Sequence, residues 1–116
     1  MNLIQEFLSV QQNIRMYHWT TKIYNQHVVS GELYEKLDGL IDKFVETFLG
    51  KNKINFDSFD IKLKKQQIIQ LLNNFKIFLM GEIELFLGEK TNSDLKNIRD
   101  EMLSEVNKSI YLLRLQ

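Results

Sequence analysis

The chain has 116 residues, with fifteen Lys and Arg against fifteen Asp and Glu, so its formal net charge is zero. It has no cysteine, which excludes disulfides, thiolate metal sites and cysteine nucleophiles, and it lacks the basic excess typical of nucleic-acid binders. No apolar run is long enough to cross a membrane, and no signal peptide is expected. We therefore expect one domain over 1–116, intracellular and soluble, with neither nucleic acid nor membrane as a partner.

The first half of the chain has the apolar periodicity of two amphipathic helices. Apolar residues recur every three or four positions, which predicts one helix over 2–22 and a second over 30–49. Ser30 is the expected N-cap of the second helix and Gly50 its expected stop. A start one turn earlier, near His27, is also compatible with the pattern.

The second half predicts two more helices after a polar linker over 50–57. The third helix is expected to begin at 57 or 58 and to end at Gly88, with a bend or a close helix contact at Gly81. Residues 91–93 offer N-caps for the last helix. Its apolar stripe consists of Leu95, Ile98, Met102, Val106, Ile110 and Leu113. No segment is expected to alternate with period two, so no strand is predicted.

Four helices with one apolar face each predict an all-α, four-helix bundle. A linker of eight residues spans at most ~28 Å, about the length of a 20-residue helix. A ferritin-like bundle with one crossover and a simple up-down-up-down bundle therefore both remain open. Ile77, Met80 and Leu85 widen the apolar arc of the third helix, which favours oligomerisation.

Two imidazoles and two carboxylates form the candidate metal site. They belong to His18, His27, Asp42 and Glu46, a donor set that suits iron, manganese or zinc better than calcium. Asp42 and Glu46 share one helix face, but this face points roughly 140–170° away from the core stripe of its helix. The acids therefore cannot bind a metal inside the bundle. If they bind one, a group outside the bundle must complete the site, and a two-fold related copy of the chain could supply it. The competing interpretation is a solvated acidic face with two structural histidines.

The same stretch resembles the ferroxidase site of Dps-type mini-ferritins. That family has a His-Trp pair late in the first helix, a second His at the start of the next helix, a Tyr seven residues later, and then an Asp and a Glu four apart. The matching residues here are His18, Trp19, His27, Tyr34, Asp42 and Glu46. The resemblance implies a ferritin-like fold and a divalent metal, iron first and manganese or zinc next. It also implies Fe(II) oxidation at a site with histidines from one subunit and acids from its neighbour.

A second resemblance leads to an alternative function. The gap between His18 and His27 is shorter than in typical mini-ferritins. The stretch is also similar to a small group of phage and giant-virus proteins of unknown function, which share its His-Trp-x-Thr-Lys opening and a pair like Gly50-Lys51. This similarity implies a non-enzymatic viral structural or host-interaction protein in the host cytoplasm. Such a protein would need no cofactor, and its motif residues would build a dimer interface.

Both interpretations predict a homo-oligomer, at least a dimer. On the second helix, Tyr34 and Val45 form an apolar strip beside Asp38 and the two candidate acidic ligands. A lone bundle would leave both strips in water. Together with Trp19, these residues are expected to form a two-fold contact or to support the metal ligands.

Overall fold

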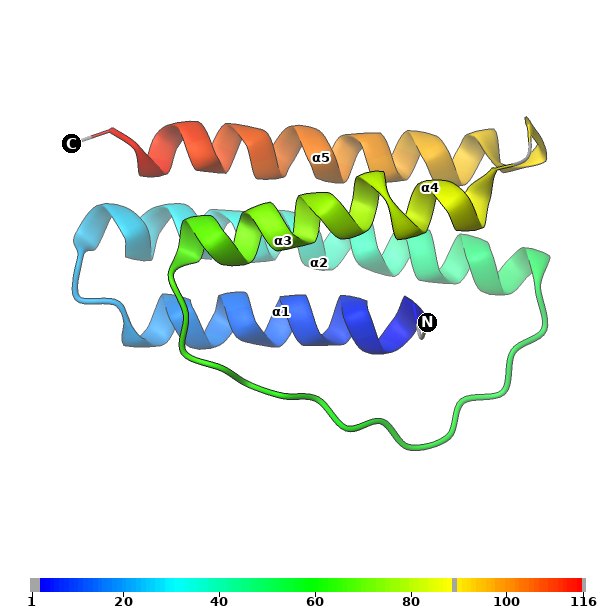
Figure 1. The fold of residues 1–116 in the computed structure, drawn as a ribbon, viewed down its shortest axis with the longest axis horizontal. Helices are drawn as coiled ribbons and strands as arrows, with labels where there is room; N and C mark the ends of the chain where they lie inside the picture. The colour runs from blue at the N-terminus through cyan, green and yellow to red at the C-terminus, as the bar shows by residue number, and fades with distance from the viewer. Residues whose placement is uncertain (1–2, 89, 116) are drawn as a thin grey trace.

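The computed structural model describes residues 3–88 and 90–115, which form a helical bundle without strands in these two ranges (Figure 1). Its helical elements are α1 (Leu3–Thr20), α2 (Tyr24–Lys51), α3 (Ile68–Met80), α4 (Glu82–Leu87), the 3-10 turn η1 (Lys90–Asn92) and α5 (Ser93–Leu113). The four sides of the bundle are α1, α2, α3 with α4, and α5. The predicted all-α four-helix bundle is therefore confirmed.

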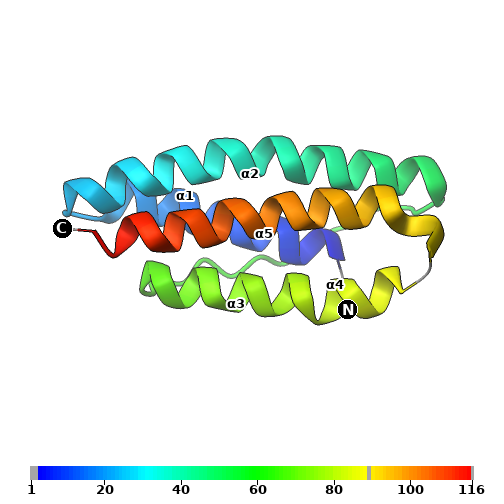
Figure 2. The ribbon, with the colours of Figure 1, turned by 90° about the horizontal axis from the view of Figure 1, so that it is seen from above.

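The bundle has one long crossover. Helix α2 packs against α1 and α5, and α3 packs against the same two helices. Figures 1 and 2 show that α2 and α3 lie diagonally opposite and run in the same direction. Residues 53–67 contain no helix and return the chain along the bundle to the end where α2 began. A single long crossover is the connectivity of ferritin-like bundles, and it excludes the simple up-down-up-down alternative.

The crossover is longer than predicted because α3 begins only at Ile68. Phe59, Ile61 and Leu63 alternate with polar residues, and this segment has neither helix nor strand. The expectation that no segment alternates with period two was therefore wrong, as was a third helix beginning at 57 or 58. Residues 53–67 can reach about 50 Å when extended, which exceeds the ~42 Å length of a 28-residue helix such as α2.

Side-chain amides of α1 hold the crossover in place. The buried Asn13 donates a hydrogen bond from Nδ2 to the Lys62 carbonyl at 3.1 Å and accepts one from the Lys64 N–H at 2.9 Å. Gln5 donates from Nε2 to the Asp60 carbonyl at 2.5 Å. These bonds supply partners for backbone polar groups of a segment that has no helix of its own to satisfy them.

The core sits between all four sides of the bundle. Phe7 of α1 lies at its centre, with ring centroids 5.3 Å from Phe44, 5.6 Å from Phe78 and 6.3 Å from Phe75. These contacts join α1 to α2 and α3. Of the helices in the described ranges, none is both long and apolar enough to cross a membrane.

Helix α2 is longer than predicted at both ends. It begins at Tyr24, so the earlier start that the sequence allowed is the one observed. Ser30 is buried inside the helix, and Gly50 is helical, because α2 continues to Lys51 with Asn52 as its C-cap. Ser30 as an N-cap and Gly50 as a stop were therefore wrong.

The predicted bend at Gly81 is confirmed, because this residue separates α3 from α4. Arg99 of α5 donates to the Leu79 carbonyl at 3.1 Å and pairs with Glu84 at 2.7 Å. Burial of its guanidinium opposes the charged form, but the hydrogen bonds to Glu84 and Asp100 prevail and raise the pKa of Arg99. Arg99 of α5 therefore connects the end of α3 to α4 across the helix break.

Candidate functional site

A short turn between α1 and α2 brings the two histidines together. His18 lies in the last turn of α1, and His27 lies in the first turn of α2, where its backbone N–H donates to the Ile23 carbonyl at 3.0 Å. Gln26 braces this turn, since its Oε1 accepts hydrogen bonds from the Tyr17 hydroxyl and, at 2.8 Å, from the Thr21 hydroxyl. The two antiparallel helices thus present both imidazoles at one end of the bundle.

The imidazoles are stacked and bonded reciprocally. Their centroids lie 3.9 Å apart with an angle of 13° between the ring planes. Nδ1 of His18 lies 2.7 Å from the His27 carbonyl oxygen, and Nδ1 of His27 lies 2.9 Å from the His18 carbonyl oxygen. A carbonyl oxygen only accepts, so both Nδ1 atoms must donate. In the neutral rings, the lone pair is therefore on Nε2 of each histidine.

Neighbouring side chains position the His18 ring. Tyr34 packs edge-on against it with centroids 5.3 Å apart, and the Arg15 guanidinium lies over the Tyr34 ring at 4.9 Å. Ser30 contacts both histidines, since its hydroxyl is 3.3 Å from Nδ1 of His18 and donates to the His27 carbonyl at 3.2 Å. Gly31 leaves the space that the ring occupies. Tyr34 is thus a supporting residue within its own chain.

The two candidate acidic ligands lie far from the histidines of the same chain. Asp42 and Glu46 are exposed on α2, and they follow His27 by distances of about 22 Å and 28 Å along the helix axis. Neither carboxylate has an ion pair or hydrogen bond within the described ranges. No three His, Cys, Asp or Glu side chains among these residues are close enough to hold one metal ion.

The expected interface residues have different surroundings. Trp19 is 70% exposed, whereas Val45 is half-buried against the core. The sequence had suggested that Asp38 belongs to an uncompensated acidic strip, but the structure gives this residue two partners. Its carboxylate accepts a hydrogen bond from Gln11 at 2.9 Å and pairs with Arg15 at 2.9 Å. The acidic strip without partners on α2 therefore reduces to its later part, which contains Asp42 and Glu46.

Sequence reasoning missed Ser30, Gly31 and Gln26 as supporting residues of the histidine pair. A glycine inside a predicted helix was an available signal, because glycine there often marks a close packing contact. Gln26 carried no such signal. Its role depends on how the turn folds.

One family model matches the chain. It is described as a family of unknown function (DUF5856) and covers residues 18–113, which include both histidines and both candidate acids. A ferritin-like family model does not match. No curated protein and no solved structure matches the chain. Because the matched segment covers most of its length, the chain belongs to the family of unknown function DUF5856.

Proposed function

We propose that the chain is an oligomeric, ferritin-like protein that binds a divalent metal ion. His18 and His27 of one subunit would supply neutral imidazole nitrogens, and Asp42 and Glu46 of a second subunit would supply charge-neutralising oxygens. Iron is the preferred metal, with manganese or zinc as alternatives. Bound iron would supply oxidation of Fe(II) to Fe(III), with peroxide or dioxygen taking up the electrons.

The observation that carries this proposal is the reciprocal bonding of the histidines. Metal-binding histidines commonly donate their second ring N–H to a carbonyl or carboxylate, which orients the ring and selects the tautomer. His18 and His27 both do so through Nδ1. Two nitrogen ligands leave a metal site incomplete, and the distant acids of the same chain cannot complete it. The donor set therefore fits a metal only when a second copy contributes.

Asparagine variants separate the two roles of each histidine, which are the hydrogen bond from Nδ1 and the metal ligand at Nε2. The Asn amide nitrogen occupies nearly the place of Nδ1, so His18→Asn with His27→Asn keeps the hydrogen bonds to the carbonyls and removes both Nε2 ligands. Metal uptake, measured by calorimetry with Fe(II), Mn(II) and Zn(II) and by elemental analysis, should be lost while the fold is kept. A wild-type protein that takes up none of these metals would refute the proposal.

A mixing experiment tests whether the site is shared between subunits. One variant carries His18→Gln and His27→Gln, and the other carries Asp42→Asn and Glu46→Gln. Neither should bind metal alone. After the two are unfolded together and refolded, each mixed dimer should regain one of its two sites. If mixing restores no binding although mixed dimers form, the site is not shared.

A second candidate function is a non-enzymatic viral structural or host-interaction module that needs no metal. It is favoured by the structural contacts that the histidines already make, in which stacked rings and Nδ1–carbonyl bonds join α1 to α2. In this case the motif residues build a dimer interface. Loss of assembly in His18→Gln with His27→Gln, together with a metal-free wild type, supports this function. Loss of metal with assembly intact refutes it.

A further inference from the structure

The charges of this neutral chain are segregated between the two halves of the bundle. Three segments, 15–31, 61–81 and 106–115, contain none of the fifteen acidic residues. All three lie in the half where α1 ends, α2 and α3 begin and α5 ends (Figure 1). We call this the basic half. The cations of the three segments are Arg15, Lys22, Lys62, Lys64, Lys65, Lys76, Lys108 and Arg114.

Most of these cations form no ion pair within the described ranges. Among the described residues, only Arg15 of this set forms an ion pair, with Asp38. Lys36, which lies beside Lys108, pairs with Glu105. The remaining ion pairs join Lys51, Lys96 and Arg99 of the opposite half to nearby carboxylates. Glu32 and Glu105 line one surface hollow together with Lys36 and Lys108, but the cations of the basic half outnumber its acidic side chains. The basic half therefore presents a net positive field.

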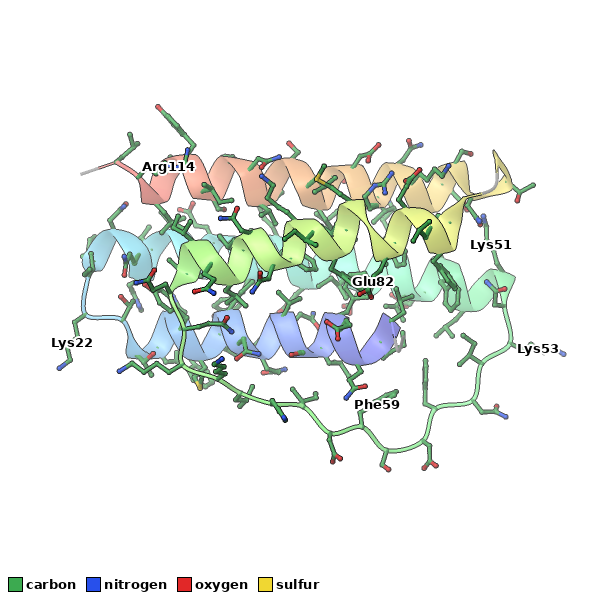
Figure 3. All side chains as sticks on the ribbon, viewed as in Figure 1. Lys22, Lys51, Lys53, Phe59, Glu82 and Arg114 are labelled. Carbon is green, nitrogen blue, oxygen red and sulfur yellow. The ribbon has the colours of Figure 1, made fainter. Side chains whose placement is uncertain are left out.

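The tip of the basic half also exposes apolar and aromatic side chains. We define the tip as Trp19, Lys22, Ile23, Tyr24, Tyr111, Arg114 and Leu115. Tyr24 is 81% exposed and Ile23 is 56% exposed. Asn25 ties the two parts of the tip together, because its Nδ2 donates to the carbonyls of Leu112 at 3.1 Å and Leu115 at 3.3 Å. Lys22 and Arg114 project at this same end (Figure 3).

We propose that the tip docks on an anionic lipid surface. Trp and Tyr favour the boundary between headgroups and acyl chains, and Lys and Arg favour anionic headgroups. Such a boundary covers the exposed apolar side chains and neutralises the cations at the same time. A nucleic acid would take up the cations and stack on some rings, but it would leave Ile23 and Leu115 in water. The docking is peripheral, so it needs no membrane-spanning helix, but it departs from the expectation that no membrane is a partner. It goes beyond the proposed metal site.

Trp19 is the only tryptophan, so its emission reports directly on the tip. Metal-free protein in chelator is added to vesicles of phosphatidylcholine alone or mixed equally with phosphatidylserine. The mixed vesicles should shift the Trp19 emission to the blue and co-sediment with the protein. Neutral vesicles should do neither, and added salt should weaken the binding. Because metal is absent, a negative result here leaves the metal proposal untouched.

Matched variants locate the contact. Lys22→Gln with Arg114→Gln should lower partitioning about 10-fold to 30-fold, since each cation near such a surface contributes about 1 kcal/mol. Lys43→Gln with Lys53→Gln removes two exposed cations of the opposite half and should change little. Tyr24→Ser should weaken binding more than Leu85→Ser, although Leu85 is 86% exposed.

Three outcomes would overturn the proposal. The first is no preference for the anionic vesicles. The second is an equal loss in the tip variants and in their controls. The third is binding to a single-stranded oligonucleotide without binding to vesicles, which would assign the basic half to nucleic acid instead.

Discussion

The His18 ring occupies the space that a side chain at Gly31 would need. A Cβ atom built on Gly31 would lie 2.7 Å from Cε1 of His18 and 3.1 Å from its Nδ1. This ring cannot easily move aside, because it is stacked on His27 and bonded to the His27 carbonyl. The glycine is therefore required by a contact between helices, in a helix interior where glycine is otherwise unfavourable.

Gly31→Ala and Gly39→Ala form a matched pair in the same helix. Nothing lies within 4 Å of a Cβ at Gly39, so Gly39→Ala should stabilise the fold by about 0.5–1 kcal/mol. Gly31→Ala gains the same helix propensity but displaces His18, and it should destabilise the fold by about 1–2 kcal/mol relative to that control. Urea unfolding monitored by circular dichroism measures both. Equal stabilisation by both changes would show that the ring moves freely.

Asn13→Ala should loosen the crossover. The change leaves the Lys62 carbonyl and the Lys64 N–H without their partner, at a cost of about 1–3 kcal/mol if they stay buried. Loosened residues 60–66 should be cleaved faster by trypsin after the lysines of this segment. Asn107→Ala, at an exposed position of α5, is the control. Unchanged cleavage of the Asn13 variant would mean that other contacts hold the crossover.

The Asp94–Lys51 pair predicts a dependence of stability on pH. The hydrogen bond from Lys51 Nζ, 2.5 Å long, lowers the pKa of Asp94 from its ordinary value of 3.8. A carboxyl whose pKa is lower in the folded state stabilises the fold above the unfolded pKa, and it loses that contribution as the pH falls through the folded value. The stability difference between wild type and Asp94→Asn should therefore be constant near neutral pH and shrink below about pH 4.

Urea unfolding over a pH series measures that difference. Glu101→Gln removes an exposed carboxylate of the same helix that lacks the Lys51 contact, so its profile should run parallel to that of the wild type. A difference for Asp94→Asn that persists unchanged at acid pH would contradict the prediction.

Val45→Lys tests the predicted two-fold contact along α2. A charge left unpaired in this contact should weaken the dimer by roughly 1–3 kcal/mol, which light scattering over a concentration series would detect. Val45 also packs against the core, so the fold needs its own control. Leu103→Lys alters a residue of α5 that packs on the core in the same way, and it should leave the dimer intact. A wild type that is monomeric at micromolar concentration would show that the contact is misplaced.

Apolar periodicity alone determined the fold class and most helices. The extents of α1 and α5 were predicted almost correctly, because each of these helices presents a single apolar face to the core. The end of α2 and the start of α3 were not predicted, because the two boundaries depend on tertiary contacts. Asn13 satisfies the backbone of the crossover from 49 and 51 residues away, and no local pattern reports such a bond.

The sequence also supplied the candidate metal ligands, which remain a prediction, since the chain has only two histidines and their helical spacing to Asp42 and Glu46 can be counted. Only the tertiary structure decided that the two imidazoles stack, that their Nδ1 atoms bond to carbonyls and that Asp38 pairs with Arg15. The basic half likewise could be recognised only from the tertiary structure. Its three acid-free segments are visible in the sequence, but a net charge of zero conceals them until the antiparallel helices and the crossover bring them to one end. Charge adds up along a chain without regard to place, whereas its electric field depends on where the fold puts each residue.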